Sequence, residues 1–176
     1  MCLKYILDGL ENKGFAVQGI RIKADDLFFE ERVRMNCFYC GKYSNNWKCP
    51  PRIPELDYRK LFYEYDNLAF IYVKYNFEGM DFQAVRRDSS VYLHKALLEC
   101  ERLLFGQGYP MAISFIGGSC KLCRDGCSKD GCANPYYARS PIEATGVNVI
   151  KSIKKYGISV TFPPNDCLYR IGLLCW

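Results

Sequence analysis

The sequence of 176 residues contains no apolar run long enough to cross a bilayer. Its N-terminal stretch also lacks the unbroken apolar core of a secretory signal, because Lys4, Asp8 and Glu11 interrupt the pattern. We therefore expect a cytoplasmic protein in a reducing compartment, with no membrane interaction. The sequence has no phosphate-binding loop, dinucleotide fingerprint or hydrolase nucleophile elbow, which excludes the enzyme classes that these motifs mark.

Histidine is almost absent, since His94 is the only one in the chain. No serine or aspartate pattern accompanies it, so the sequence does not indicate a catalytic triad. His94 lies off the apolar stripe of its predicted helix, and we expect it at the surface or beside a site rather than as a catalytic base. The net charge of +5 is mild and argues against nucleic acid as the main partner.

Cysteine, in contrast, is abundant, with 11 in the chain. The odd number fits a complete disulfide framework poorly, and cysteines of a cytoplasmic protein are more often metal ligands or catalysts. Seven of them form two groups in loops rich in Gly, Asn, Lys and Pro. The two groups are Cys37-x2-Cys40-x8-Cys49, followed by Pro50 and Pro51, and Cys120-x2-Cys123-x3-Cys127-x4-Cys132.

The second group places four thiols within thirteen positions. Structural zinc sites usually separate two close cysteine pairs by a dozen or more residues, whereas a short run of four followed by a proline is typical of a cubane iron–sulfur loop. Four glycines would let backbone amides turn toward cluster sulfurs, and three cations would offset the negative charge of the cluster. These residues are Gly117, Gly118, Gly126, Gly131, Lys121, Arg124 and Lys129. Zinc and, less well, disulfides stay open as alternatives.

The first group supplies three thiols, with Lys42, Lys48 and Arg52 around them. Its fourth ligand could be Cys167, Cys175, a carboxylate or a solvent molecule, or one iron could stay open to a substrate. Cys100 lies on an apolar helix stripe and is expected to be a core residue.

Helical and strand patterns alternate around these loops, which predicts a single layered domain over residues 1–176. The fold class is α/β, with α+β possible, and we expect a mixed β-sheet packed against helices. Helices are predicted at 3–13, 54–65, 83–105 and 147–157, and strands at 15–23, 68–75, 110–116 and 166–176. A short helix at 140–144 would begin with Ser140 as its N-cap, Pro141 at its first position and Glu143 completing a capping box.

The order "VRMNCFYCGKYSNNWKCPP" followed by "GGSCKLCRDGCSKDGCANPYYARSPIEATG" resembles a prokaryotic family of unknown function whose members are described as predicted metal-binding proteins. The resemblance covers residues 33–157 and includes a stretch in which this chain has Ser140-Pro141-Ile142 instead of Pro-Ser-Met. It implies a metal, most readily an iron–sulfur cluster, and no defined reaction.

The sequence therefore predicts a metal-binding protein that holds one or two [4Fe-4S] clusters and transfers electrons to or from a redox partner protein. The ligands would be Cys37, Cys40, Cys49, Cys120, Cys123, Cys127 and Cys132. One alternative is an enzyme that binds a small-molecule substrate at an open iron of the three-cysteine site. The other is an interaction module stabilised by zinc. Whether the protein is an enzyme stays open at this stage.

Overall fold

The computed structural model describes residues 2–176 of the chain. Its helical elements, two of them short 3-10 turns named η1 and η2, are α1 (Leu3–Glu11), η1 (Ala24–Asp26), α2 (Glu31–Tyr39), α3 (Tyr58–Tyr63), α4 (Phe82–Phe105), η2 (Ile142–Thr145) and α5 (Val149–Lys154). Its strands are β1 (Gln18–Ile22), β2 (Leu68–Asn76), β3 (Ile113–Phe115) and β4 (Cys167–Cys175). No helix within the described residues is both long and apolar enough to cross a membrane.

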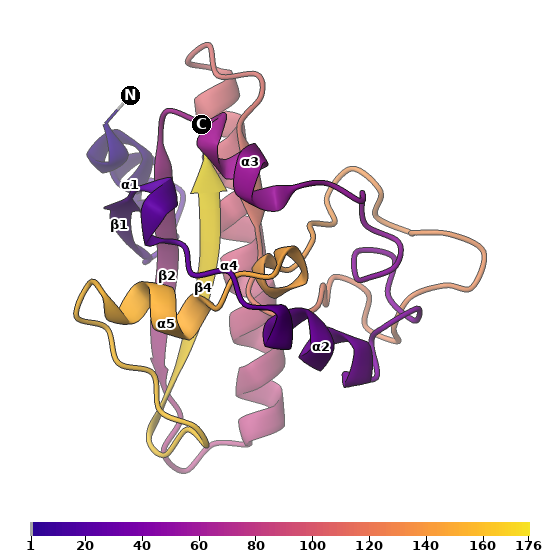
Figure 1. Cartoon of the computed structure of the whole chain (residues 1–176). Helices are drawn as coiled ribbons and strands as arrows, with labels where there is room; N and C mark the ends of the chain where they lie inside the picture. The colour runs from indigo at the N-terminus through magenta and orange to yellow at the C-terminus, as the bar shows by residue number, and fades with distance from the viewer. Residues whose placement is uncertain (1) are drawn as a thin grey trace.

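The four strands form one sheet in the order β1-β2-β4-β3, with β2 and β4 at its centre (Figure 1). The predicted combination of helices and sheet in one layered domain is confirmed. The expected mixture of strand directions is wrong, because every neighbouring pair is antiparallel. Strands β2 and β3 do run the same way, with α4 between them in the chain. The last strand, β4, inserts between them and runs opposite to both.

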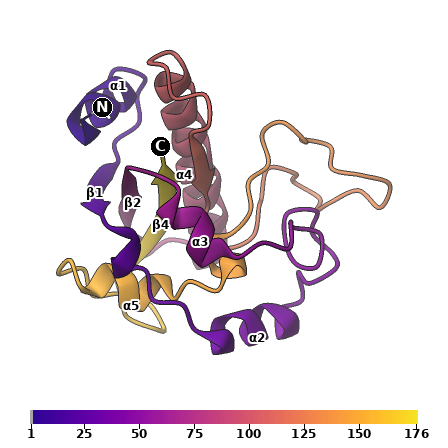
Figure 2. The same cartoon turned by 45° about the horizontal axis from the view of Figure 1, so that its top comes forward.

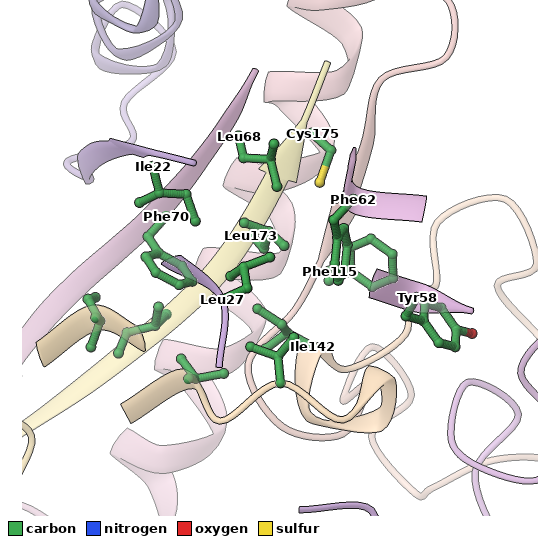
Figure 3. Packing of buried hydrophobic residues seen from close by; sticks show 14 residues of the cluster. Ile22, Leu27, Tyr58, Phe62, Leu68, Phe70, Phe115, Ile142, Leu173 and Cys175 are labelled. Carbon is green, nitrogen blue, oxygen red and sulfur yellow. The ribbon is translucent and has the colours of Figure 1, made fainter. Parts of the chain in front are cut away.

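Both faces of the sheet are buried, because side chains alternate between two cores along each central strand. Leu68, Phe70 and Leu173 face the core that α3 and α5 cover (Figure 3), whereas Ala69 and Leu174 face the core that α1 and α4 cover. Figure 2 shows α1 and α4 on the side of the sheet opposite to α3 and α5. Burial on both faces explains why the 68–75 stretch reads as almost continuously apolar.

Helix α4 packs along the sheet through the apolar stripe that its sequence predicts. Leu93, Ala96, Leu97, Cys100 and Leu104 are all buried, which confirms Cys100 as a core residue. The helix lies close to β4 at Gly172, where a Cβ atom would lie 2.5 Å from Leu97 Cδ1 and 2.8 Å from the carbonyl oxygen of Phe115. A larger residue at Gly172 would therefore push the helix away from the sheet.

The short helix predicted at 140–144 is a 3-10 turn that begins later, so the role of Ser140 as N-cap is a wrong prediction. Pro141 holds the cap position, and no side chain caps the turn. The reason lies in backbone pairing, since the amide of Ile116 donates to the carbonyl of Ser140 and the amide of Ile142 donates to the carbonyl of Ile116. These bonds hold the chain extended up to Ile142.

Helix α2 was not predicted, and it carries the start of the first cysteine group. None of its nine residues is buried, so it has no apolar stripe for a sequence pattern to reveal. Figure 1 shows α2 away from the sheet, on the side where the two cysteine-containing loops project.

Candidate metal centre

The first cysteine group begins on a helix and ends in a loop. Cys37 lies in the last turn of α2 and Cys40 is the residue that ends this helix, so the expected loop position is wrong for Cys37. Cys49 follows in the loop and is only 5% exposed, which is unusual for a loop side chain. The loop is closed by a 2.9 Å hydrogen bond from the amide of Ser44 to the carbonyl of Pro50. Asn46 and Cys49 are both buried, which indicates that the loop turns inward at these two residues.

The second cysteine group lies in a loop without helix or strand, as predicted, and its four thiols are half-buried. The loop leaves β3 at Gly117, where any Cβ atom would clash with the carbonyl oxygen of Ile171, so the backbone passes directly over β4. Asn134 Nδ2 donates to the sulfur of Cys123 over 3.3 Å. Hydrogen bonds of this kind orient a thiolate ligand and tune the metal that it binds.

The two groups, 71 or more positions apart in the chain, meet in space. Asn46 Nδ2 donates to the carbonyl of Cys120 over 3.2 Å, and Trp47 Nε1 donates to the carbonyl of Ser128 over 2.7 Å. Figures 1 and 2 both show the two loops projecting together from the same side of the sheet. From the sequence we predicted two separate sites, and the cysteine spacing within each group does not indicate that the two loops are in contact.

Three cavities adjoin these loops, and two of them are lined by the predicted cysteines. A cavity of about 760 Å³ is lined by Cys120, Cys123, Cys127 and Cys132. A smaller cavity of about 390 Å³ is lined by Cys37, Cys40 and Cys49. Cys40, Gly118 and Ser119 line both, so they form the wall that the cavities share. The structure thus brings all seven predicted ligands to one region, while their binding of a metal stays a prediction.

The cysteines surround space instead of converging on a point. Within residues 2–176, no three His, Cys, Asp or Glu side chains are placed so that they could hold a metal ion directly. A tetrahedral zinc with bonds of about 2.3 Å would need its four sulfurs drawn close together. Soft thiolates are donors that both zinc and iron–sulfur clusters use, so the chemistry of these side chains fits a metal.

The thiols influence each other electrostatically. Burial raises the pKa of Cys49 to about 12 and that of Cys37 to about 11, and nearby thiolates add to both shifts. Burial also raises the pKa of Cys120. The charges that act on Cys49 include those of Cys120 and Cys127 from the second group. A bound cation would reverse this balance, because it stabilises the thiolate form of its ligands.

Cations from other parts of the fold line the larger cavity. Lys121 comes from the cysteine loop, as predicted, whereas Arg86 lies on α4 and Arg170 on β4. Burial lowers the pKa of Lys121 to about 8, and the charges of Arg170 and Arg86 lower it further. Among the described residues, none of these three cations forms an ion pair with a carboxylate. Sequence reasoning missed both arginines because only the folded chain brings them to the loop.

One carboxylate also lies at the site, and its role differs from the predicted one. Glu143 in η2 lines the smaller cavity, and both of its oxygens accept from the amide of Gly118, at 3.1 and 3.3 Å. It was predicted only as part of a capping box with Ser140. Burial raises the pKa of Glu143, while backbone amides, including that of Gly118, and the charges of Lys121 and Arg170 oppose this shift.

The remaining candidates lie away from the cavities. Cys167 and Cys175, considered as fourth ligands, stand at opposite ends of β4, and neither lines either cavity. Cys175 is fully buried in the core. His94 was expected at the surface or beside a site, but it is only 1% exposed, and its Nε2 contacts the carbonyl of Tyr137 at 2.9 Å. The surface expectation is therefore wrong, because α4 is covered on this side by the 136–139 segment.

The comparisons with known proteins identify a family for this chain. No curated protein and no solved structure matches the chain. A family model matches residues 20–175, which extends beyond the 33–157 stretch that carries the resemblance in sequence. The chain therefore belongs to the DUF2284 family, described as predicted metal-binding proteins.

Proposed function

We propose that this protein binds two iron–sulfur clusters and transfers single electrons to or from a partner protein. The observation that carries the proposal is the meeting of both cysteine groups around two adjoining cavities. A cubane cluster, when bound, supplies one-electron redox chemistry. We treat residues 1–176 as one domain for this function.

The four-cysteine cavity supports a cubane in both its donors and its charge. Cys120, Cys123, Cys127 and Cys132 would hold the cluster, and Asn134 would keep its hydrogen bond to the Cys123 sulfur. An oxidised cubane with four thiolates has a net charge of about −2, for which neighbouring cations compensate. The cluster would thereby add negative charge beside Lys121, Arg86 and Arg170, which form no contact ion pair among the described residues.

The smaller cavity supports a second cluster held by Cys37, Cys40 and Cys49. Because only three thiols line it, one iron would have a different environment from the others. Apolar side chains, including Val33, Val147 and Val149, line the same cavity. Enclosed cavities of a few hundred Å³ with mostly apolar walls are typical of small-molecule sites. This favours, as the second candidate function, an enzyme that binds a small substrate at that iron.

The surface around the loops supports an acidic redox partner. The larger cavity is also lined by Lys42, Arg87 and Arg124, which form no ion pairs among the described residues. Helix α2 exposes Phe38 and Tyr39 in the first cysteine group. Complementary charge increases the rate of association, and exposed aromatic residues are enriched in interfaces. The eleven free thiols support a reducing compartment such as the cytoplasm.

The first test is metal and sulfide analysis of protein purified without oxygen. We expect about eight iron and eight acid-labile sulfide per chain, with broad visible absorption. Cys127→Ala and Cys49→Ala should each remove about half of the iron, whereas Cys167→Ser, whose thiol lines neither cavity, should keep all of it. Iron without sulfide, or about one or two zinc per chain with no visible absorption, would overturn the proposal in favour of a zinc-stabilised interaction module.

A further inference from the structure

We propose that Glu143 is the fourth protein ligand of the metal site formed by Cys37, Cys40 and Cys49, an inference that rests on the proposed iron–sulfur function. The three thiols leave one position of a cubane without a cysteine. Glu143 reaches the same cavity from η2, 94 positions after Cys49 in the chain. Among the described residues that line this cavity, it is the only one with a carboxylate.

The fold fixes Glu143 opposite the cysteines through backbone contacts that surround it. The segment before α2 pairs with the segment after η2, since the amide of Glu30 donates to the carbonyl of Gly146 at 2.9 Å. The amide of Asn148 also donates to the carbonyl of Phe28 at 2.7 Å. These bonds hold η2 against α2, which carries Cys37. The placement of Glu143 is therefore part of the fold and does not depend on a flexible loop.

The surroundings of the Glu143 side chain favour a role as a metal ligand. Its hydrogen-bond donor is the amide of Gly118, and within residues 2–176 it has no ion pair. The side chain is half-buried, and a carboxylate in such a place is normally paired with a cation or coordinates a metal. The Gly118 amide orients the carboxylate while leaving its other lone pairs free. Lys121 and Arg170 act on this carboxylate without a contact ion pair among the described residues, so a metal in the cavity that it shares with Cys37 would be its directly bound cation.

A carboxylate in this position has a chemical consequence for the site. Oxygen ligands are harder than thiolates and bind soft iron–sulfur sites less strongly. The iron held by Glu143 would therefore be the one that a substrate or solvent molecule can reach. The site would then have four protein ligands and would still be able to bind a small molecule in the cavity beside it.

The experiment compares the full-length wild-type protein with Glu143→Gln, both reconstituted with iron and sulfide without oxygen. Glutamine retains an oxygen that can accept from Gly118, so the fold should persist, but it is a poor iron ligand. Asn36→Ala is the matched control, because Asn36 lines the same cavity without a ligand role. Electron–nuclear double resonance on protein labelled with ¹³C at its glutamate carboxyl groups reports directly on a bound carboxylate.

We expect a ¹³C coupling to the reduced cluster in the wild type and in Asn36→Ala, and its loss in Glu143→Gln. Mild oxidation should also release about one iron per chain more from Glu143→Gln than from the wild type, leaving the signal of a three-iron cluster. Absence of the coupling from wild-type protein that contains full iron and sulfide would overturn the role of Glu143 alone. Absence of iron and sulfide would overturn the proposed function itself.

Discussion

Asn46 donates a 3.2 Å hydrogen bond from Nδ2 to the carbonyl oxygen of Cys120 and so joins the two cysteine groups across 74 positions of the chain. The other end of the same amide is also used, since Oδ1 accepts from the amide of Lys48 at 3.0 Å. Asn46 is only 5% exposed, so water cannot easily replace either bond. The two loops are therefore connected by a buried side chain and should respond to metal binding together.

Replacing Asn46 with alanine should destabilise this junction. The carbonyl of Cys120 and the amide of Lys48 would both lose a buried partner, at a cost of about 1–3 kcal/mol in the free energy of unfolding. Urea unfolding of both proteins would measure the difference. Asn45→Ala is the control, because Asn45 is exposed and makes only a 3.4 Å bond to Gly41. Equal losses in the two variants would contradict the prediction.

The sequence predicted those elements whose apolar residues repeat with a clear period. Strand β2 and helix α4 were found because each buries a continuous set of side chains in the core. Helix α2 was missed because it buries none. The direction of β4 relative to β3 could not be predicted, since alternation of side chains is the same for parallel and antiparallel neighbours.

For the candidate site, cysteine spacing predicted which thiols lie together, because residues within one short loop stay close in any fold. It could not predict what the fold brings to the loops from elsewhere. Arg86, Glu143 and Arg170 lie on separate elements, and none has a local pattern that distinguishes it from an ordinary surface residue. Their roles depend on long-range packing that the sequence order does not contain.

Replacing Gly172 with alanine should destabilise the contact between α4 and the sheet. The new Cβ atom would lie 2.5 Å from Leu97 Cδ1 and 2.8 Å from the carbonyl oxygen of Phe115. Overpacking of a buried contact costs about 1–3 kcal/mol, and at this chain length each kcal/mol lowers the melting temperature by about 2–4 °C. Thermal unfolding measures the shift. In Gly106→Ala the nearest atoms would lie 3.6 Å away, so an equally large loss there would refute the steric explanation.

Stability should fall in mild acid because His94 is buried in its neutral form. Burial, with the charges of Arg139 and Lys121, lowers its pKa from the ordinary 6.5 to about 4, against the opposing effects of the hydrogen bond to Tyr137 and the charge of Glu101. Between these two values the unfolded chain binds a proton that the folded chain does not. His94 therefore contributes no penalty above about pH 6.5, and up to about 3 kcal/mol of stability is lost as the pH falls toward 4.

The variant that tests this dependence is His94→Gln, whose amide can still donate to the carbonyl of Tyr137. Urea unfolding of both proteins at pH 7 and pH 5 would show whether the loss in acid is specific to the histidine. We expect the wild type to lose more stability than the variant over this interval. If both lose the same amount, other groups determine the acid sensitivity and the assignment to His94 is wrong.

Replacing Lys121 with methionine should lower the reduction potential of the proposed four-cysteine cluster. Lys121 is half-buried, and its Nζ donates to the carbonyl of Ser119 at 3.0 Å, in the wall between the cavities. Reduction adds negative charge, so removing a poorly screened cation disfavours it. A loss of about 1 kcal/mol corresponds to roughly 40 mV for one electron, which potentiometric titration by spin resonance can measure.

The matched variant is Arg124→Gln, which removes the same charge from the same loop. Arg124 is exposed, so water and salt screen it more strongly than Lys121. We therefore expect a smaller shift for Arg124→Gln, and one that shrinks further at high ionic strength, whereas the shift for Lys121→Met should persist. Equal shifts in the two variants would mean that net charge alone sets the potential and that the buried position of Lys121 has no special effect.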